Sequence, residues 1–376
     1  MRLFDLPLRL LAAVFVLSSV APAASARELV VGQVAPFSGP QAVTGKAIHA
    51  GARLYFDHVN AQGGVNGVPL RLVTRDDGQQ PSETVRLARA LIQQEAPVAL
   101  LGTVGTDNVK ALIDDGVLGR SGTALVGAVS GASAVIAGAN VFVVKASYHD
   151  EVDTLFRQLA GVGIRRVGLV YQDDALGQDV IVGAEAAAAR NGIALVGRAG
   201  YERNTVRVEE AVEAMLQANP QALFLGATTA AGIEFVRQYR ARGGDATLYG
   251  LSIIDTRQLL NALGPGGARG FAFSVVLPQE AQDTLAVNRE YLKLRAASHD
   301  PDLSARSIEG FIAAKALVQA LRGVGATPTA AAMLRALQGA RKLDVGGYVL
   351  DFGVAGRSGS TYVDFAMFGD GGRVIR

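Results

Sequence analysis

Two pairs of adjacent carboxylates are the first residues in this sequence whose types could do chemistry. Asp76-Asp77 and Asp173-Asp174 each follow a short apolar run, so both pairs are expected in loops at the ends of strands. General acid–base catalysis is one role for such a pair. Turn formation or hydrogen bonding at a hinge is the commoner role, because acidic side chains in loops accept hydrogen bonds from the nearby backbone.

The sequence contains no histidine, cysteine or serine motif that is typical of a metal site or of nucleophilic catalysis. The four histidines, His49, His58, His149 and His299, are scattered, without H-E-x-x-H or any other zinc-binding spacing. The chain has no cysteine, which excludes disulfides, thiolate metal sites and a cysteine nucleophile. No serine lies in a G-x-S-x-G nucleophile motif. The sequence therefore predicts neither a metal site nor an enzyme.

The sequence does not match the spacing of the known nucleotide-binding motifs. Gly45-Lys46 is similar to the end of a phosphate-binding P-loop, but five residues instead of four separate Gly39 from Gly45. Ala47 also stands where a Ser or Thr would bind magnesium. No G-x-G-x-x-G follows a strand, and the run Gly264-Pro265-Gly266-Gly267 follows a helix and contains proline, which indicates a turn. We predict no cofactor.

The remaining candidates for a binding site are small polar residues at the ends of predicted strands. They are Ser38, Thr106, Ser130 with Gly131, and Thr228. Loop hydroxyls and backbone N–H groups at helix starts suit the binding of a carboxylate. Each of these residues alone is more often a helix N-cap, so they indicate a site only as a group.

The elements that must position these residues alternate between strand and helix. The first unit runs from a strand at Leu29–Val34 through a helix at Val43–Asn60 to a strand at Pro69–Val73. Further strands are predicted at Val98–Leu101, Ala124–Gly127, Val167–Tyr171, Ile193–Val196, Ala222–Leu225, Thr247–Leu251 and Phe271–Leu277, and further helices at Ser82–Glu95, Ala175–Arg190, Val208–Ala218 and Gly232–Arg242. This alternation is typical of βαβ units with mostly parallel sheets.

The rhythm changes after Leu277. Helices are predicted at Asp283–Ala297, Ser304–Leu321 and Thr329–Leu337, followed by alternating stretches at Gly346–Phe352 and Thr361–Phe368 that predict strands closing two sheets. Length and rhythm together favour two α/β lobes.

One uncharged segment, Ser121–Val144, is long enough to span a bilayer. Its glycines and polar residues interrupt it, so we predict a strand, a glycine-rich loop, a short helix and a strand, all buried in a parallel sheet.

The first 26 residues have the features of a secretory signal: Arg2 and Arg9, an apolar stretch at Leu10–Leu17, and an A-x-A site at Ala24–Ala26. Their removal leaves 350 of the 376 residues and changes the formal net charge from +2 to +1, because two Arg and one Asp are lost. A nearly neutral chain argues against nucleic-acid binding. Without a cysteine there is no lipid anchor, so we expect a soluble periplasmic protein.

Short motifs, in order along the chain, carry a family resemblance. Ser38-Gly39-Pro40 is followed by Gly45 and by the N-A-Q-G-G-V-N-G run at Asn60–Gly67. Later motifs are Asp76-Asp77, the glycine-led loop Gly102–Thr106, and Tyr171-Gln172-Asp173-Asp174 with Gly177. In order and spacing the mature chain resembles the periplasmic Leu/Ile/Val-binding protein family, the type I solute-binding proteins of ABC importers for branched-chain and related amino acids.

The resemblance implies an α/β fold of the type I periplasmic binding protein class. This fold has two Rossmann-like lobes with parallel sheets, joined by three hinge crossovers, and the ligand lies in the cleft between them. By resemblance the crossovers fall near residues 141–147, 271–278 and 351–360. Lobe one would comprise residues 27–145 plus 279–350, and lobe two residues 146–278 plus 351–376.

The resemblance also implies a set of ligand-binding positions. Thr106 stands where the family binds the ligand carboxylate through a hydroxyl, and Ser130 and Gly131 stand at a second loop that contacts the carboxylate. Thr44 stands at a side-chain pocket position, and Tyr148 would supply an aromatic wall on lobe two.

Three positions depart from the family pattern. Thr228 and Ser252 stand where the amino-acid binders have a tyrosine and a glutamate on lobe two, and Leu176 stands at a usually aromatic contact. A buried ammonium without a carboxylate partner would be costly. Either Asp174 or Asp255 substitutes for the glutamate, or the ligand lacks an ammonium group. The family's disulfide is also missing, because Gln79 and Gly105 stand at the two positions where its cysteines usually lie.

The function implied is that of a non-enzymatic solute receptor, in which a small carboxylate-bearing ligand closes the two lobes for recognition by an ABC permease of the inner membrane. The ligand would be a branched-chain or hydrophobic amino acid, or a related organic or aromatic acid. The alternative is a ligand-sensing module of the same fold that feeds a signalling receptor. A secreted hydrolase or dehydrogenase is a third hypothesis, but the sequence has no catalytic triad, no set of metal ligands and no nucleotide-binding loop to support it.

Overall fold

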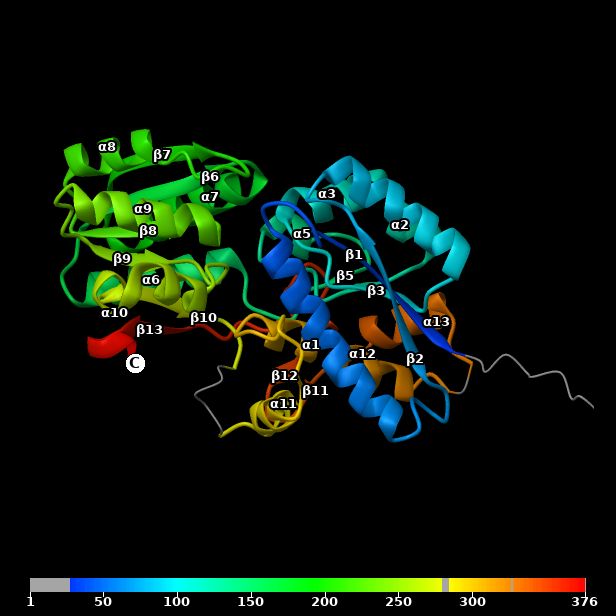
Figure 1. Ribbon diagram of the computed structural model, residues 1–376. Helices are drawn as coiled ribbons and strands as arrows, with labels where there is room; N and C mark the ends of the chain where they lie inside the picture. Colours follow the sequence, from blue (N-terminus) through cyan, green and yellow to red (C-terminus); the bar gives the residue numbers. More distant parts are fainter. Residues whose placement is uncertain (1–27, 279–283, 326, 376) are drawn as a thin grey trace, which may run out of the picture.

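The computed structural model describes residues 28–278, 284–325 and 327–375. The predicted export signal lies outside these ranges, as does Asp283, the first residue of the helix expected at Asp283–Ala297. Two α/β units lie side by side, each built on its own sheet (Figure 1). Within the described residues, no helix is both long enough and apolar enough to cross a membrane.

The first sheet has five strands, all parallel, in the order β2-β1-β3-β4-β5. The strands are β1 (Leu29–Ala35), β2 (Leu70–Asp76), β3 (Ala99–Leu101), β4 (Leu125–Val126) and β5 (Val141–Phe142). The helices between them are α1 (Ala42–Ala61), α2 (Pro81–Glu95), α3 (Thr106–Asp115), α4 (Val117–Ser121) and α5 (Ser133–Ile136). The segment Ser121–Val144 is thus buried strand, loop, short helix and strand, as predicted.

The second sheet has seven strands in the order β14-β13-β10-β9-β8-β6-β7. Its strands are β6 (Arg166–Asp173), β7 (Ala194–Glu202), β8 (Ala222–Gly226), β9 (Thr247–Gly250), β10 (Phe271–Val275), β13 (Asp364–Phe368) and β14 (Val374–Ile375). The β10–β13 and β13–β14 pairs are antiparallel, and the other strand pairs of this sheet are parallel. The helices are α6 (Tyr148–Gly161), α7 (Ala175–Asn191), α8 (Glu209–Ala218), α9 (Thr229–Ala241) and α10 (Thr256–Ala268).

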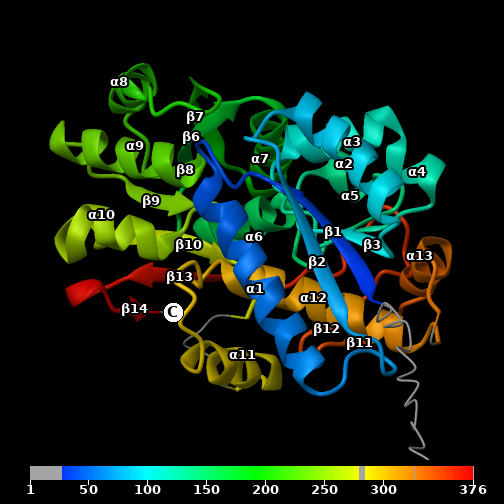
Figure 2. The ribbon, with the colours of Figure 1, turned by 45° about the vertical axis from the view of Figure 1, so that its right-hand side comes forward.

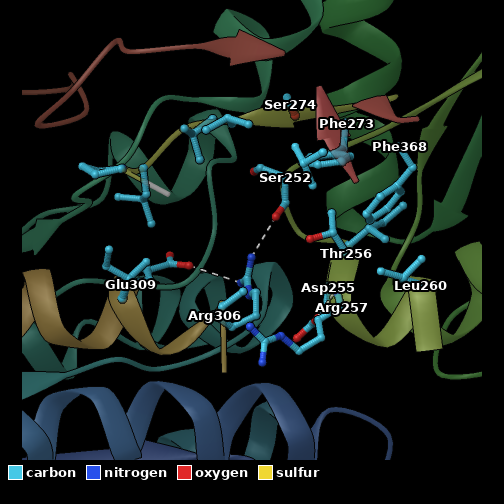
Figure 3. A pocket seen from close by; sticks show the side chains of 18 of the residues that line it. Ser252, Asp255, Thr256, Arg257, Leu260, Phe273, Ser274, Arg306, Glu309 and Phe368 are labelled. Carbon is cyan, nitrogen blue, oxygen red and sulfur yellow. Dashed lines mark hydrogen bonds and ion pairs between the residues drawn. The ribbon is translucent and has the colours of Figure 1, made fainter. Parts of the chain in front are cut away.

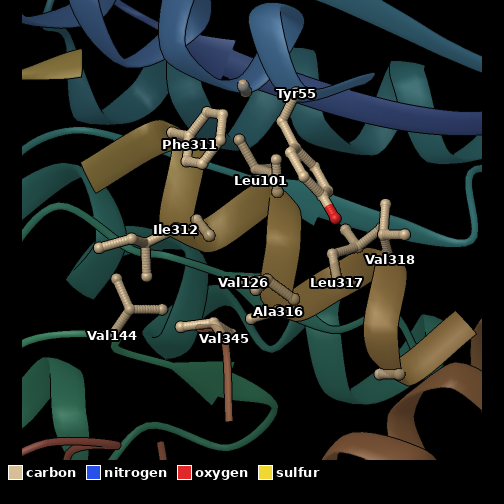
Figure 4. Packing of buried hydrophobic residues seen from close by; sticks show 14 of the residues in the cluster. Tyr55, Leu101, Val126, Val144, Phe311, Ile312, Ala316, Leu317, Val318 and Val345 are labelled. Carbon is tan, nitrogen blue, oxygen red and sulfur yellow. The ribbon is translucent and has the colours of Figure 1, made fainter. Parts of the chain in front are cut away.

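The chain then returns to the first unit with three helices. These are α11 (Ala286–Ala296), α12 (Ser307–Arg322) and α13 (Ala330–Gln338), and both ribbon views place α12 beside α1 (Figure 2). Nearly all of α12 is buried. Phe311 of α12 packs edge-on against Tyr55 of α1, with ring centroids 5.0 Å apart (Figure 4). This burial explains the almost continuous apolar sequence of α12.

Glycines allow α1 and α12 to approach so closely. A Cβ at Gly51 would lie 1.8 Å from the carbonyl oxygen of Ser307, and one at Gly310 would lie 2.0 Å from that of Ile48. Both contacts are backbone, so neither can be relieved by a side-chain rotation.

We therefore expect Gly310→Ala to lower the free energy of unfolding by about 1–3 kcal/mol, because α12 must move away from α1. Urea unfolding followed by circular dichroism measures this. Gly323→Ala is the matched control, since a Cβ there meets nothing nearer than 3.5 Å. Equal midpoints for the two variants would show that the helices separate without cost.

Three chain segments run between the units and are hydrogen-bonded to one another. The Tyr348 hydroxyl donates to the carbonyl oxygens of Val144 (2.9 Å) and Val276 (3.2 Å). The Gly359 N–H donates to Val143 O at 2.9 Å. The three connections thus form one compact hinge region.

The structure corrects three expectations from the sequence. The predicted strand at 346–352 does not close the first sheet, because β12 (Val349–Leu350) pairs only with β11 (Leu343–Asp344). The turn expected at Gly264–Gly267 is confined to Gly264, where φ is 68°, because a second helical segment of α10 begins after this kink and includes Pro265. The strand expected at Ile193–Val196 extends to Glu202 as β7, because Tyr201 is buried against the next helix.

Candidate functional site

A small cavity of about 50 Å³ lies between the two units, and we call it the cleft cavity. Loops that follow strands β3, β4, β6, β7, β8 and β9 line it, together with the start of α1. The carboxyl ends of parallel strands are where α/β sheets bind ligands. The position is therefore that of a ligand site, and its walls come from both units.

Six of the ten predicted ligand-binding residues line the cleft cavity. They are Thr44, Thr106, Tyr148, Asp174, Leu176 and Thr228. Thr106 is the first residue of α3, and Tyr148 the first of α6. Their shared position at helix starts follows from the βα alternation, which puts successive helix N-termini at one edge of each sheet.

Ser130 and Gly131 lie behind this wall. The Ser130 hydroxyl is fully buried and lies 2.9 Å from the Thr106 hydroxyl, with which it shares a hydrogen bond. The Gly131 carbonyl accepts the Tyr148 N–H at 2.9 Å, and a Cβ at Gly131 would lie 2.8 Å from the Tyr148 ring. Both residues therefore position Thr106 and Tyr148, and neither lines the cavity.

Ser252 and Asp255 line a different cavity. Asp255 caps α10 by accepting the N–H groups of Arg257 and Gln258, both at 3.0 Å. The Ser252 N–H and hydroxyl donate to the buried carboxylate of Glu151, at 2.9 and 2.8 Å. Of the two aspartates considered as partners for an ammonium group, only Asp174 therefore lies beside Thr106.

Arg203 is a residue of the cleft cavity that the sequence analysis missed. Its Nη2 donates to Gln79 O (3.3 Å) and to Asn108 Oδ1 (3.2 Å), both in the first unit. Its Nε lies 3.1 Å from an oxygen of Asp107 and 3.4 Å from one of Asp174. Arg203 directly follows β7, a position typical of site residues in α/β sheets. The sequence analysis did not identify it, because the predicted strand ended at Val196.

The charges around Arg203 come from opposite units. Asp107 belongs to α3, whereas Asp174 caps α7 by accepting the N–H groups of Leu176 and Gly177. Burial raises the pKa of Asp174, and so does the nearby charge of Asp107, while Arg203 opposes the rise. The guanidinium thus holds together two carboxylates that would otherwise repel each other across the cleft.

A second arginine, Arg306, stands at the start of α12 and also lines the cleft cavity. Its Nη1 donates to Ser252 O at 2.8 Å, across the units, and its Nη2 lies 3.2 Å from Glu309 Oε2. Glu309 Oε1 lies 2.9 Å from Lys145 Nζ, and both side chains are almost fully buried. This buried ion-pair network spans the hinge region.

The larger cavity, of about 530 Å³, lies on the other side of Arg306, and we call it the hinge cavity (Figure 3). Both units contribute to it, through α10, β10 and β13 on one side and α11 and α12 on the other. Its walls are mainly apolar. Ser252, Asp255, Arg306 and Glu309 supply polar groups.

The Asp76-Asp77 pair is structural. Asp76 accepts N–H groups from Phe37 (2.9 Å) and Gly78 (3.0 Å), and Asp77 accepts the Thr84 hydroxyl at 2.7 Å. These contacts hold the loops that follow β1 and β2. Within the described residues, no cluster of three or more potential ligands could hold a metal ion.

The sequence profile of the family described as "Periplasmic binding protein" matches residues 28–370. The chain belongs to this family. The structure also matches that of a substrate-binding periplasmic protein from Ralstonia solanacearum, with 44% identity, a TM-score of 0.89 and coverage of 93% of this chain and 99% of the other. The type I periplasmic binding protein fold expected from the sequence is thereby confirmed.

Two further relatives carry the name expected from the sequence. A possible leucine/isoleucine/valine-binding protein from Rhodopirellula baltica is 27% identical, with a TM-score of 0.87 and coverage of 93% and 97% of the two chains. A Leu/Ile/Val-binding protein homolog 8 from Brucella suis is 26% identical over 83% of this chain and 81% of the relative. The resemblance to Leu/Ile/Val-binding proteins is confirmed, and the family is one of solute-binding proteins.

Proposed function

We propose that this protein is the periplasmic solute receptor of an ABC importer, and that it binds a small carboxylate-bearing ligand in the cleft. The observation that carries the proposal is the bridge made by Arg203 in the cleft cavity. Arg203 belongs to the seven-stranded unit, yet it contacts Asp107, Asn108 and Gln79 of the other unit. A guanidinium in this position can exchange one aspartate partner for a ligand carboxylate.

Lobe one would comprise residues 27–145 plus 279–350, and lobe two residues 146–278 plus 351–376. The hinge region lets the lobes open and admit a ligand larger than the present cleft cavity. Closure then places the ligand against contacts from both lobes, and an ABC permease of the inner membrane recognises the closed form. The ligand shifts the equilibrium only by its extra affinity for that form.

Thr106 would donate its hydroxyl to the ligand carboxylate, while Tyr148 and Leu176 would cover the apolar part of the ligand. A ligand ammonium would pair with Asp174, because Asp255 faces the hinge cavity instead. A ligand without an ammonium would leave the Asp174–Arg203 pair intact. Branched-chain or hydrophobic amino acids and related organic or aromatic acids are thus the two ligand classes to compare.

Calorimetric titration of the mature protein tests this proposal, after unfolding and refolding to remove any carried-over ligand. The panel pairs branched-chain and aromatic amino acids with their deaminated acids. Binding with a decrease in the radius of gyration in small-angle X-ray scattering is the expected result. If the amino acids alone bind, Asp174 is the partner of the ammonium, and Asp174→Asn should abolish the preference. If no member binds or compacts the protein, the proposal fails.

A further inference from the structure

The hinge cavity and the cleft cavity share one wall, the Arg306 side chain. Its guanidinium is fixed between Ser252 O and the Glu309 carboxylate (Figure 3). Within the described residues its Nε has no hydrogen-bond partner, although it is buried. A ligand that reached from one cavity into the other would therefore contact Arg306.

The two cavities differ tenfold in volume. The cleft cavity, about 50 Å³, holds on the order of one or two water molecules. The hinge cavity, about 530 Å³, lies in the range of about 300–1,000 Å³ that is common for small-molecule sites. In the present conformation, an apolar group larger than a few atoms thus has room in the hinge cavity and not in the cleft cavity.

The walls of the hinge cavity suit an extended apolar chain. Its large apolar lining residues are Leu260, Phe273 and Phe368 from the seven-stranded unit, and Leu277, Leu292 and Ile308 from the hinge and the first unit. Figure 3 shows Leu260, Phe273 and Phe368 together, across the cavity from Glu309 and Arg306. Asp255 and Arg257, at the start of α10, also line the cavity, so its apolar surface is bordered by charged groups from both units.

We infer that the two cavities form one amphipathic site, which takes a monocarboxylate with a long apolar body. The carboxylate binds beside Thr106 and Arg203, and the apolar body passes Arg306 into the hinge cavity. This inference rests on the proposed function and names the substrate class of the same site. It also gives the ligand contacts with both lobes, so that a longer body stabilises the closed form more.

Chain length is the variable that tests the inference. In titrations with butanoate, hexanoate, octanoate and decanoate, each added methylene that enters the hinge cavity should tighten Kd by about fourfold. The gain should stop when the cavity is filled. A short acid, by contrast, contacts only the cleft.

Leu260→Trp fills the hinge cavity from α10 without touching the cleft. We expect this variant to bind butanoate as the wild type does and to lose the additional affinity for octanoate and decanoate. Leu263→Trp is the matched control, because Leu263 lies on the same helix and packs into the core of the seven-stranded unit, outside the cavity lining. Urea midpoints of both variants verify that each is folded.

The outcomes separate this inference from the proposed function. A flat dependence on chain length, with butanoate still bound, would overturn the inference and leave the proposed function standing. So would decanoate binding that Leu260→Trp leaves unchanged. If decanoate binding depends on Leu260 but not on Arg203, the cavities hold separate ligands and the single-site inference is wrong. Failure of every acid and amino acid to bind would overturn both proposals.

Discussion

Arg203→Met is expected to weaken binding of the best ligand of the titration panel by about ten- to a hundredfold and to favour the open form. Arg203 neutralises Asp107 and Asp174, which belong to opposite units. Without the guanidinium these carboxylates face each other across the cleft, and the hydrogen bonds to Gln79 and Asn108 are also lost. Losing one partner of a partly buried charge pair commonly costs about 2–5 kcal/mol, and partial exposure places this case near the lower end.

Titration calorimetry measures the loss of affinity, and small-angle X-ray scattering measures the radius of gyration with and without ligand. Arg207→Met is the matched control, because Arg207 lies four residues on and forms an ion pair with Glu202 in which both side chains are exposed. Its removal should change neither quantity, since exposed ion pairs contribute little. Identical affinity and scattering for Arg203→Met and wild type would show that Arg203 does not hold the units together.

Glu309→Gln is expected to lower the free energy of unfolding by about 3–5 kcal/mol. Lys145 is completely buried, and its Nζ lies 2.9 Å from Glu309 Oε1. Removing the carboxylate charge leaves the buried ammonium without its partner. Urea unfolding measures the change. The matched control is Lys315→Met on the same helix, which breaks a more exposed ion pair with Glu290 and should cost about 1 kcal/mol or less.

The double variant Lys145→Met/Glu309→Gln should recover part of this loss, because it removes both buried charges. If the double variant is as unstable as the sum of the two single variants, the two residues do not interact in the folded protein. In that case the network is not what stabilises the hinge region.

The stability of the Glu309→Gln variant is expected to increase with pH. Burial lowers the pKa of Lys145, and Glu309 opposes this shift. Without Glu309, the folded state binds the Lys145 proton still less tightly than the unfolded chain does. Stability should therefore rise with pH up to the ordinary lysine pKa of about 10.4, and the variant should recover stability relative to wild type over this range.

Local patterns were sufficient to predict most of the fold. The alternation of short apolar runs with helical segments determined two mainly parallel sheets, because side-chain burial in a strand or helix depends on residues close in sequence. The family resemblance, and not the local pattern alone, indicated Thr106, Tyr148 and Leu176, which line the cleft cavity. The local patterns also indicated a hydrogen-bonding role for Asp76-Asp77, which accepts N–H groups within its own loop and from the loop that follows β1.

The tertiary structure alone decided which loops meet. Arg203 reaches the cleft because β7 lies at the edge of its sheet, and because the other unit places Asp107 opposite its end. Asp255 and Ser252 instead face the hinge cavity, since Asp255 caps α10 and Ser252 is hydrogen-bonded to Glu151 of α6. Arg306 lines both cavities only because α12 returns to α1 from far along the chain. A sequence pattern determines which side chains are buried and which local hydrogen bonds form, but contacts between distant loops depend on strand order and on how the two units pack.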